Sequence, residues 1–195
     1  MPPANVLTRA VPLELVIVRT DKVAVVVRNL VAYTDGIEFT LSIRLRPPRS
    51  VFPSHPLGLG PGGDKHRDDL LRFGVQFADG VKATTLQSFV GRRPDEEPRI
   101  WLSQNGGSGG AERWELGFWL WPLPPHGPLT FVVAWLGENV TETRAELDTG
   151  PIREAAAQAE VLWEPSNDGT AAVGTDVFMV GFDDELKGRA KPESD

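Results

Sequence analysis

The most constraining feature of this chain is a strict alternation of apolar and polar residues over residues 37–46. Every second residue there is Ile, Phe or Leu, and the residues between them are Glu, Thr, Ser or Arg. A period of two puts the apolar side chains on one side of an extended chain, so the stretch predicts a half-buried strand. Because Asp35-Gly36 suits a tight turn and residues 23–33 are rich in β-branched side chains, we expect an antiparallel hairpin.

The same pattern returns further along the chain. Residues 73–77 alternate as far as Asp79-Gly80, and a weaker strand pattern resumes over residues 81–89. Short strands separated by Gly, Pro and Asp, without helices between them, are typical of antiparallel sandwiches. We therefore predict an all-β fold, an antiparallel immunoglobulin-like or fibronectin-like β-sandwich of about seven to nine strands.

One helix is predicted near the end of this pattern. Pro151 suits the first turn of a helix, and apolar residues then recur every three or four positions. We expect a helix over residues 151–163, with Trp163 anchoring its last turn. The predicted organisation is a sandwich domain of residues 1–163 followed by a loose tail, residues 164–195, rich in Pro, Ser, Asn, Asp and Gly.

The tail contains an apolar island at residues 177–182, which an acidic run at 183–185 follows. An island of this length cannot fold alone, so its side chains need a partner surface. It either pairs as a terminal strand with its own sheet or adds as a strand to another subunit or protein. The second interpretation makes the island a partner-binding site formed by Val177, Phe178, Met179, Val180 and Phe182.

Tryptophan is unusually frequent, with six residues against one tyrosine. In residues 114–121, one face carries Trp114, Leu, Phe and Leu, and Trp119 and Trp121 lie on the opposite face. A strand that is apolar on both faces must be covered twice. The second face predicts either a packing surface, covered by the helix, the tail or a partner, or a stacking platform for a flat ligand such as a sugar. We expect at least one of Trp119 and Trp121 to be covered.

Charge and composition exclude several classes of partner. The formal net charge is -7 and the pI is near 5.0, so neither nucleic acid nor an anionic membrane is an expected partner. There is no cysteine, which removes disulfides and thiolate chemistry. No apolar run approaches the roughly 20 residues of a membrane span, and residues 1–15 do not resemble a secretory leader. We therefore expect a cytoplasmic protein.

Few residues are placed to carry chemistry. His55 and His66 share the loop 47–69 with three aspartates and could surround a divalent ion, which keeps a metal-dependent hydrolase open as a third interpretation. Their spacing matches no zinc or calcium template, so no metal site is assigned. The glycine stretch 105–110 precedes a strand and no helix, so we expect a mobile hairpin loop there and no nucleophile elbow. Neither a catalytic residue nor a cofactor is predicted.

Three segments carry a resemblance to known sequences. They are FGVQFADG at residues 73–80, the glycine stretch at 105–110 and WLWPLPPHGPLTF at residues 119–131. Together they resemble a group of uncharacterised β-sandwich proteins from actinobacteria, over most of residues 10–163. The resemblance implies a β-sandwich fold and a cytoplasmic setting, and it implies no activity.

Three observations bear on function: the lack of a catalytic constellation, the doubly apolar strand and the tail island. They favour a non-catalytic protein–protein interaction or assembly module that binds another protein or a second copy of itself. The alternative is a carbohydrate-binding module that uses an exposed tryptophan.

Overall fold

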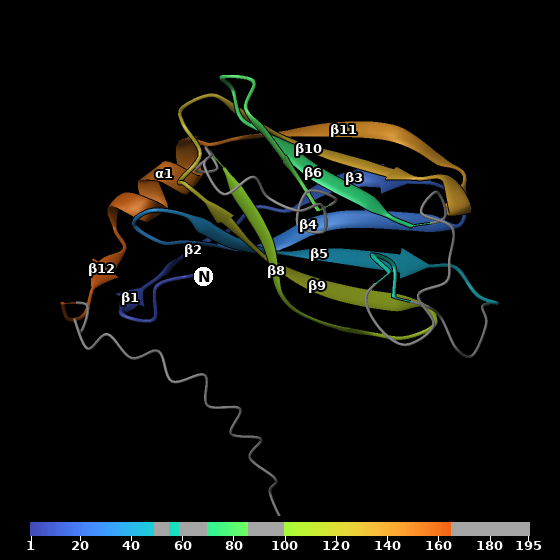
Figure 1. Cartoon of the computed structure of the whole chain (residues 1–195), viewed down its shortest axis with the longest axis horizontal. Coiled ribbons are helices and arrows are strands. Elements are labelled where there is room, and N and C mark those ends of the chain that lie inside the picture. Colours follow the sequence, from blue (N-terminus) through green and yellow to red (C-terminus); the bar gives the residue numbers. More distant parts are fainter. Residues whose placement is uncertain (49–54, 59–69, 86–99, 165–195) are drawn as a thin grey trace, which may run out of the picture. The chain divides into compact units, whose positions relative to one another are not determined.

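Two antiparallel sheets, a small two-stranded sheet and one α-helix make up the described part of the chain (Figure 1). The chain divides by its internal contacts into Met1–Glu164 and Pro165–Asp195. All described residues belong to the first unit, and the expected all-β fold is confirmed. The computed structural model describes residues 1–48, 55–58, 70–85 and 100–164.

The larger sheet has the strand order β2-β4-β5-β9-β8, and β3 also pairs with β4. Pro12, which has no N–H to donate, separates β2 from β3, and both lie along the same edge of β4. The predicted hairpin is confirmed as β4 and β5, and its turn is closed by the Tyr33 N–H, which donates to the Gly36 carbonyl. The strands are β2 (Arg9–Val11), β3 (Leu15–Arg19), β4 (Val23–Ala32), β5 (Ile37–Leu45), β8 (Trp101–Gly109) and β9 (Arg113–Trp121).

The smaller sheet has the strand order β11-β10-β6-β7. The second predicted hairpin is confirmed as β6 and β7, and Gly80 in its turn has a φ of 86°. That positive φ explains why glycine follows Asp79 at this point. The strands are β6 (Arg72–Gln76), β7 (Lys82–Thr84), β10 (Pro128–Trp135) and β11 (Val140–Asp148), and a short 3-10 helix, η2 (Leu136–Glu138), joins the last two.

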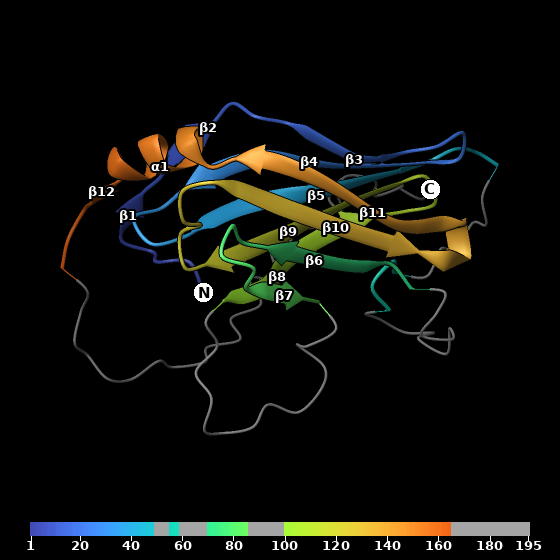
Figure 2. The same ribbon diagram turned by 90° about the horizontal axis from the view of Figure 1, so that it is seen from above.

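The two main sheets face each other across an apolar core. Phe39 of β5 meets Phe73 of β6 and Phe131 of β10, with ring centroids 6.1 and 5.4 Å apart, and it stacks on Phe118 of β9. All four rings are buried. Along the edges, β11 lies beside β3 and β7 lies close to β8 (Figure 2). Side chains from both sheets therefore fill one core, as in a β-sandwich.

The helix is shorter than predicted. It spans Gly150–Ala157 (α1), whereas the sequence pattern predicted residues 151–163. The helix contacts β2 and β4, and two of its residues, Ile152 and Ala156, are buried. Trp163, expected to anchor the last turn, is 59% exposed.

The helix ends early because the N-terminal segment supplies competing hydrogen bonds. Arg9 Nε donates to the Gln158 carbonyl, and the Leu162 N–H donates to the Asn5 carbonyl. The Gln158 carbonyl and the Leu162 N–H therefore bond to the N-terminal segment and not within further helical turns. The chain after the helix instead forms β12 (Glu160–Val161), which pairs with β1 (Val6–Leu7). This extra pair, together with the break at Pro12, brings the strands in the described part to twelve, above the expected number.

The glycine stretch 105–110 was also predicted wrongly, because most of it belongs to strand β8 and is not a loop. Gly106, Gly107 and Gly109 pair with residues of β9, after a bulge that follows Gln104. A Cβ at Gly109 would lie 2.4 Å from Trp114 Cδ2, and one at Gly107 would lie 2.9 Å from Leu116 Cδ2. The glycines therefore make room for large side chains of the neighbouring strand.

Candidate binding surfaces

Trp119 and Trp121 share the outer face of β9, the face that points away from the core, but they differ in exposure. Trp119 is 2% exposed and Trp121 is 40% exposed. The Trp119 and Tyr33 rings pack in a T-shaped arrangement with centroids 5.0 Å apart. The Trp119 ring also lies so close to Gly36 that a Cβ there would be 2.4 Å from Trp119 Cη2. The expectation that at least one of the two would be covered is confirmed, and the β4–β5 turn contributes to that cover.

Trp121 has an aromatic neighbour that the sequence patterns did not single out as a site residue. Trp101 of β8 lies directly opposite Trp121 in the β8–β9 register, so both side chains point to the same face. Trp101 is 39% exposed. We call Trp101 and Trp121 the tryptophan pair. The sequence does not show that β8 pairs with β9. Without that pairing, Trp101 is only an apolar residue at a strand end, and nothing places it beside Trp121.

A chain of polar contacts runs beside the tryptophan pair. The Tyr33 hydroxyl and Asn105 Nδ2 both donate to the Glu38 carboxylate, one to each oxygen. Asn105 reaches Glu38 across the intervening strand because Gly117 has no side chain; a Cβ there would lie 2.6 Å from Asn105 Oδ1. Burial raises the pKa of Tyr33, and the hydrogen bond to the Glu38 carboxylate and its charge raise it further. Tyr33 thus remains a neutral donor that holds the carboxylate in place.

The other end of the same face holds a second carboxylate, Glu115. Its Oε1 lies 2.8 Å from Arg44 Nη1 and 2.9 Å from Arg113 Nε, and it accepts a hydrogen bond from Ser42. Burial raises the pKa of Glu115, but the hydrogen bonds from Arg44, Arg113 and Ser42 outweigh it and leave the pKa below its ordinary value. An open hollow of about 450 Å³ lies alongside, lined by residues 108–113 and Glu115. Two arginines already pair with this carboxylate, so the cluster is suited to stabilising the sheet.

The loop 47–69, to which no metal site was assigned from the sequence, is only partly described. His55 lies within the described residues, whereas His66 and the loop aspartates Asp64, Asp68 and Asp69 lie outside them. His55 Nδ1 accepts a hydrogen bond from the Leu57 N–H, its ring lies 4.9 Å from that of Trp114, and burial lowers its pKa. In the described part of the chain, no group of three or more His, Asp or Glu side chains could hold a metal ion.

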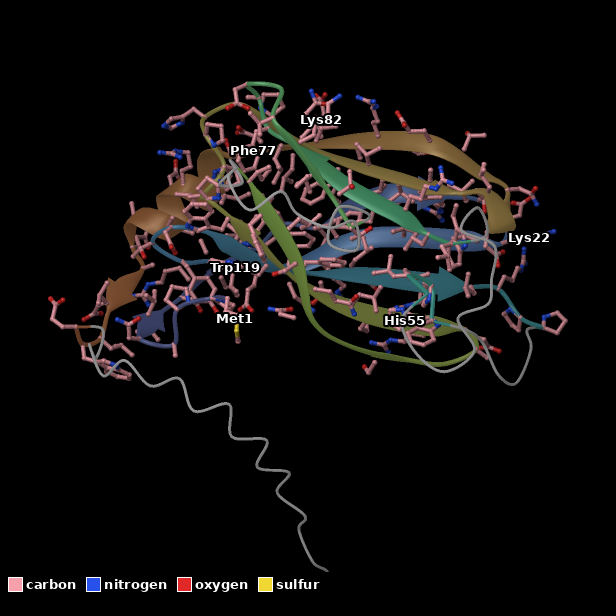
Figure 3. All side chains as sticks on the ribbon, viewed as in Figure 1. Met1, Lys22, His55, Phe77, Lys82 and Trp119 are labelled. Carbon is pink, nitrogen blue, oxygen red and sulfur yellow. The ribbon has the colours of Figure 1, made fainter. Side chains whose placement is uncertain are left out.

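Figure 3 shows Trp119 and His55 toward opposite ends of the larger sheet. Trp119 marks the end that carries the tryptophan pair, and His55, through Trp114, marks the end that carries Glu115. The aromatic and charged features of the outer face are therefore separated along the strands.

Further exposed apolar side chains lie on the two-stranded sheet β1–β12 and on the two residues that follow it. Four side chains of this segment are between 44% and 59% exposed. Asn5 fixes the strand pair through its carbonyl, which accepts from the Leu162 N–H, and through its Nδ2, which donates to the Trp163 carbonyl. We call the strand pair, together with Leu162 and Trp163, the terminal ribbon. Its exposed residues are Leu7, Val161, Leu162 and Trp163.

The predicted partner-binding residues Val177, Phe178, Met179, Val180 and Phe182 lie outside the described residues. No helix within the described ranges is long and apolar enough to cross a membrane. Comparison with protein families, curated proteins and solved structures found no match for this chain.

Proposed function

We propose that this protein is a non-catalytic module that binds another protein through the terminal ribbon. The observation that carries the proposal is the exposure of four apolar side chains on or just after a strand pair that belongs to neither main sheet: Leu7, Val161, Leu162 and Trp163. Leu7 and Val161 lie on opposite faces of the pair, so a partner that covers all four side chains would wrap around it. Tryptophan in particular supplies much of the binding energy at protein interfaces.

The ribbon also has backbone to offer a partner. β1 and β12 are each two residues long, and among the described residues they pair only with each other. A two-stranded ribbon of this kind is marginally stable in water, so an added strand or a covering surface would stabilise it. The ribbon therefore supports strand addition at its edge as well as side-chain burial.

Charge supports a partner with a basic rim. The ribbon carries Glu160 and is followed by Glu164, and the chain has a formal net charge of -7. Two copies of so acidic a chain repel each other, whereas lysine or arginine around an apolar patch would be attracted. We therefore favour a different, basic-rimmed protein over a second copy as the occupant.

The tail extends the same proposal. It follows the ribbon directly in sequence, and its island at residues 177–182 has the apolar pattern of an added strand. We propose that the island contributes to partner binding. A cytoplasmic setting and kinship with actinobacterial β-sandwich proteins, both suggested by the sequence, belong to the same proposal.

The test compares two exposed leucines. Immobilised wild type, Leu162→Asp and Leu136→Asp are exposed to lysate, and any captured protein is purified and titrated against each variant at two salt concentrations. We expect Leu162→Asp to weaken binding at least about tenfold, while Leu136→Asp, on the 3-10 helix, binds as wild type does. Added salt should weaken binding modestly.

Several outcomes would contradict the proposal. Equal binding by wild type and Leu162→Asp would remove the ribbon as the surface. A wild-type solution mass that doubles with concentration, and does not double in Leu162→Asp, would identify a second copy as the occupant. If Phe178→Asp combined with Val180→Asp preserves partner binding and protease resistance after Glu164, the tail island has no part in the interaction.

A further inference from the structure

On the outer face of the larger sheet, the row next to the tryptophan pair contains two polar side chains with the buried Trp119 between them. In the strand registers, Ser103, Trp119 and Glu38 form the row that follows Trp101 and Trp121. Successive rows of a sheet face are about 7 Å apart and neighbouring strands about 5 Å apart. Glu38 is therefore within reach of groups at the rim of a ring stacked on Trp121.

This corner of the sheet is held in place before any ligand arrives. Trp119 lies between the tryptophan pair and Glu38 in the registers and is buried against Tyr33, so this part of the sheet is already packed. The Glu38 carboxylate receives hydrogen bonds from Tyr33 and Asn105, so its position is set from two sides. A carboxylate has about four acceptor positions, and two donors leave room for additional hydroxyl groups. A ligand would therefore meet a fixed surface and lose little binding energy in ordering it.

We propose that the tryptophan pair, together with Glu38 and Asn105, binds a neutral pyranose unit of an oligosaccharide. A pyranose has a flat apolar face of C–H groups and a rim of hydroxyl groups. The exposed indole rings match the flat face, and the Glu38 carboxylate and the Asn105 amide match the hydroxyl rim.

Charge determines which ligands fit. Glu38 adds a negative charge beside the platform, and the chain has a formal net charge of -7. Phosphorylated, sulfated or acidic sugars would be repelled, as would nucleic acid, although nucleobases also stack on tryptophan. A neutral hexose or pentose polymer meets no such penalty, because its hydroxyl groups can donate to the carboxylate.

The experiment is affinity electrophoresis of the full chain in gels that contain xylan, mannan, a mixed-linkage β-glucan or amylopectin. We expect at least one of these polymers to retard the wild type. Trp121→Tyr keeps an aromatic ring and should retain most of the retardation. Trp121→Leu keeps apolar volume without a ring and should bind about tenfold more weakly. The melting temperature of each variant shows that it is folded.

Two controls separate this site from the terminal ribbon. Trp163→Ala removes an exposed tryptophan of the ribbon and should leave retardation unchanged while weakening partner-protein binding. Trp101→Leu should act as Trp121→Leu does. The proposal is overturned if none of the four polymers retards the wild type, if Trp121→Leu is retarded as strongly as Trp121→Tyr, or if the Leu variants lose the protein partner and not the polymer.

Discussion

At one end of the outer face of the larger sheet, Arg44, Arg113 and Ser42 surround Glu115, whereas at the other end Trp101 and Trp121 remain about two-fifths exposed. Both ends are built on the same strands, β5, β8 and β9. At the charged end, three neighbouring side chains pair with Oε1 of the carboxylate. At the aromatic end, apolar surface remains open, and this end is therefore the better candidate for ligand binding.

The aromatic end itself contains both a covered and an exposed tryptophan. Trp119 is covered, Trp121 two residues later is not, and the alternation of the strand places them on the same face. The difference arises outside the strand, because Tyr33 and Gly36 of the β4–β5 turn lie against Trp119. Cover by a turn, and not strand position, therefore distinguishes a packing tryptophan from an available one.

The largest expected effect comes from exchanging these two tryptophans for alanine. Trp119→Ala should lower the free energy of unfolding by about 3–5 kcal/mol, since it removes a buried ring that its surroundings cannot replace. Trp121→Ala should cost only about 1–2 kcal/mol, because much of its surface is already in water. Chemical denaturation of both variants gives the two values.

Trp163→Ala serves as the baseline in that series, because this residue is the most exposed tryptophan in the described part of the chain. Its free energy of unfolding should stay within about 0.5 kcal/mol of the wild type. If Trp119→Ala and Trp121→Ala lower the free energy of unfolding equally, the β4–β5 turn does not bury Trp119 more effectively than Trp121 in solution.

Both hairpins could be predicted from the sequence because their signals are local. Asp35-Gly36 and Asp79-Gly80 each lie at the junction of strand patterns, and alternation fixes which side chains point inward. The interior positions Leu116, Phe118 and Leu120 follow from the same period and are buried.

The features that were predicted wrongly or missed depend on contacts distant in sequence. The end of α1 depends on Arg9 and Asn5 at the other terminus, and the strand role of Gly109 depends on the ring of Trp114. Trp101 gains its partner only once β8 is paired with β9. A single sequence contains these residues but no indication of which of them meet.

A smaller effect is expected at the contact that links the strands of the aromatic end. Gly117→Ala would place a Cβ 2.6 Å from Asn105 Oδ1, so Asn105 must move and its hydrogen bond to Glu38 is disturbed. We expect a loss of about 1 kcal/mol in the free energy of unfolding, because the exposed Asn105 side chain can move aside and the cost is that of one hydrogen bond.

Asn105→Ala provides the matched test of that cause. If the side chain of Asn105 is the obstacle, the double variant Gly117→Ala with Asn105→Ala should lose less than the sum of the single losses. Simple additivity of the two changes would show that Gly117 is required for its backbone and not for the passage of Asn105 to Glu38.

The smallest effect is expected at the charged end, where it depends on pH. The pKa of Glu115 is lowered in the folded protein, so its ionised form stabilises the fold above the ordinary value of 4.5, and that contribution is lost as pH falls below it. Glu115→Gln should therefore reduce stability near pH 7 by up to about 1 kcal/mol, as for a partly exposed ion pair. The gap between wild type and variant should close as the pH is lowered past 4.5 in denaturation measurements. A gap that stays constant with pH would mean that the arginines do not stabilise the ionised carboxylate, and the contrast between the two ends of the face would then rest on exposure alone.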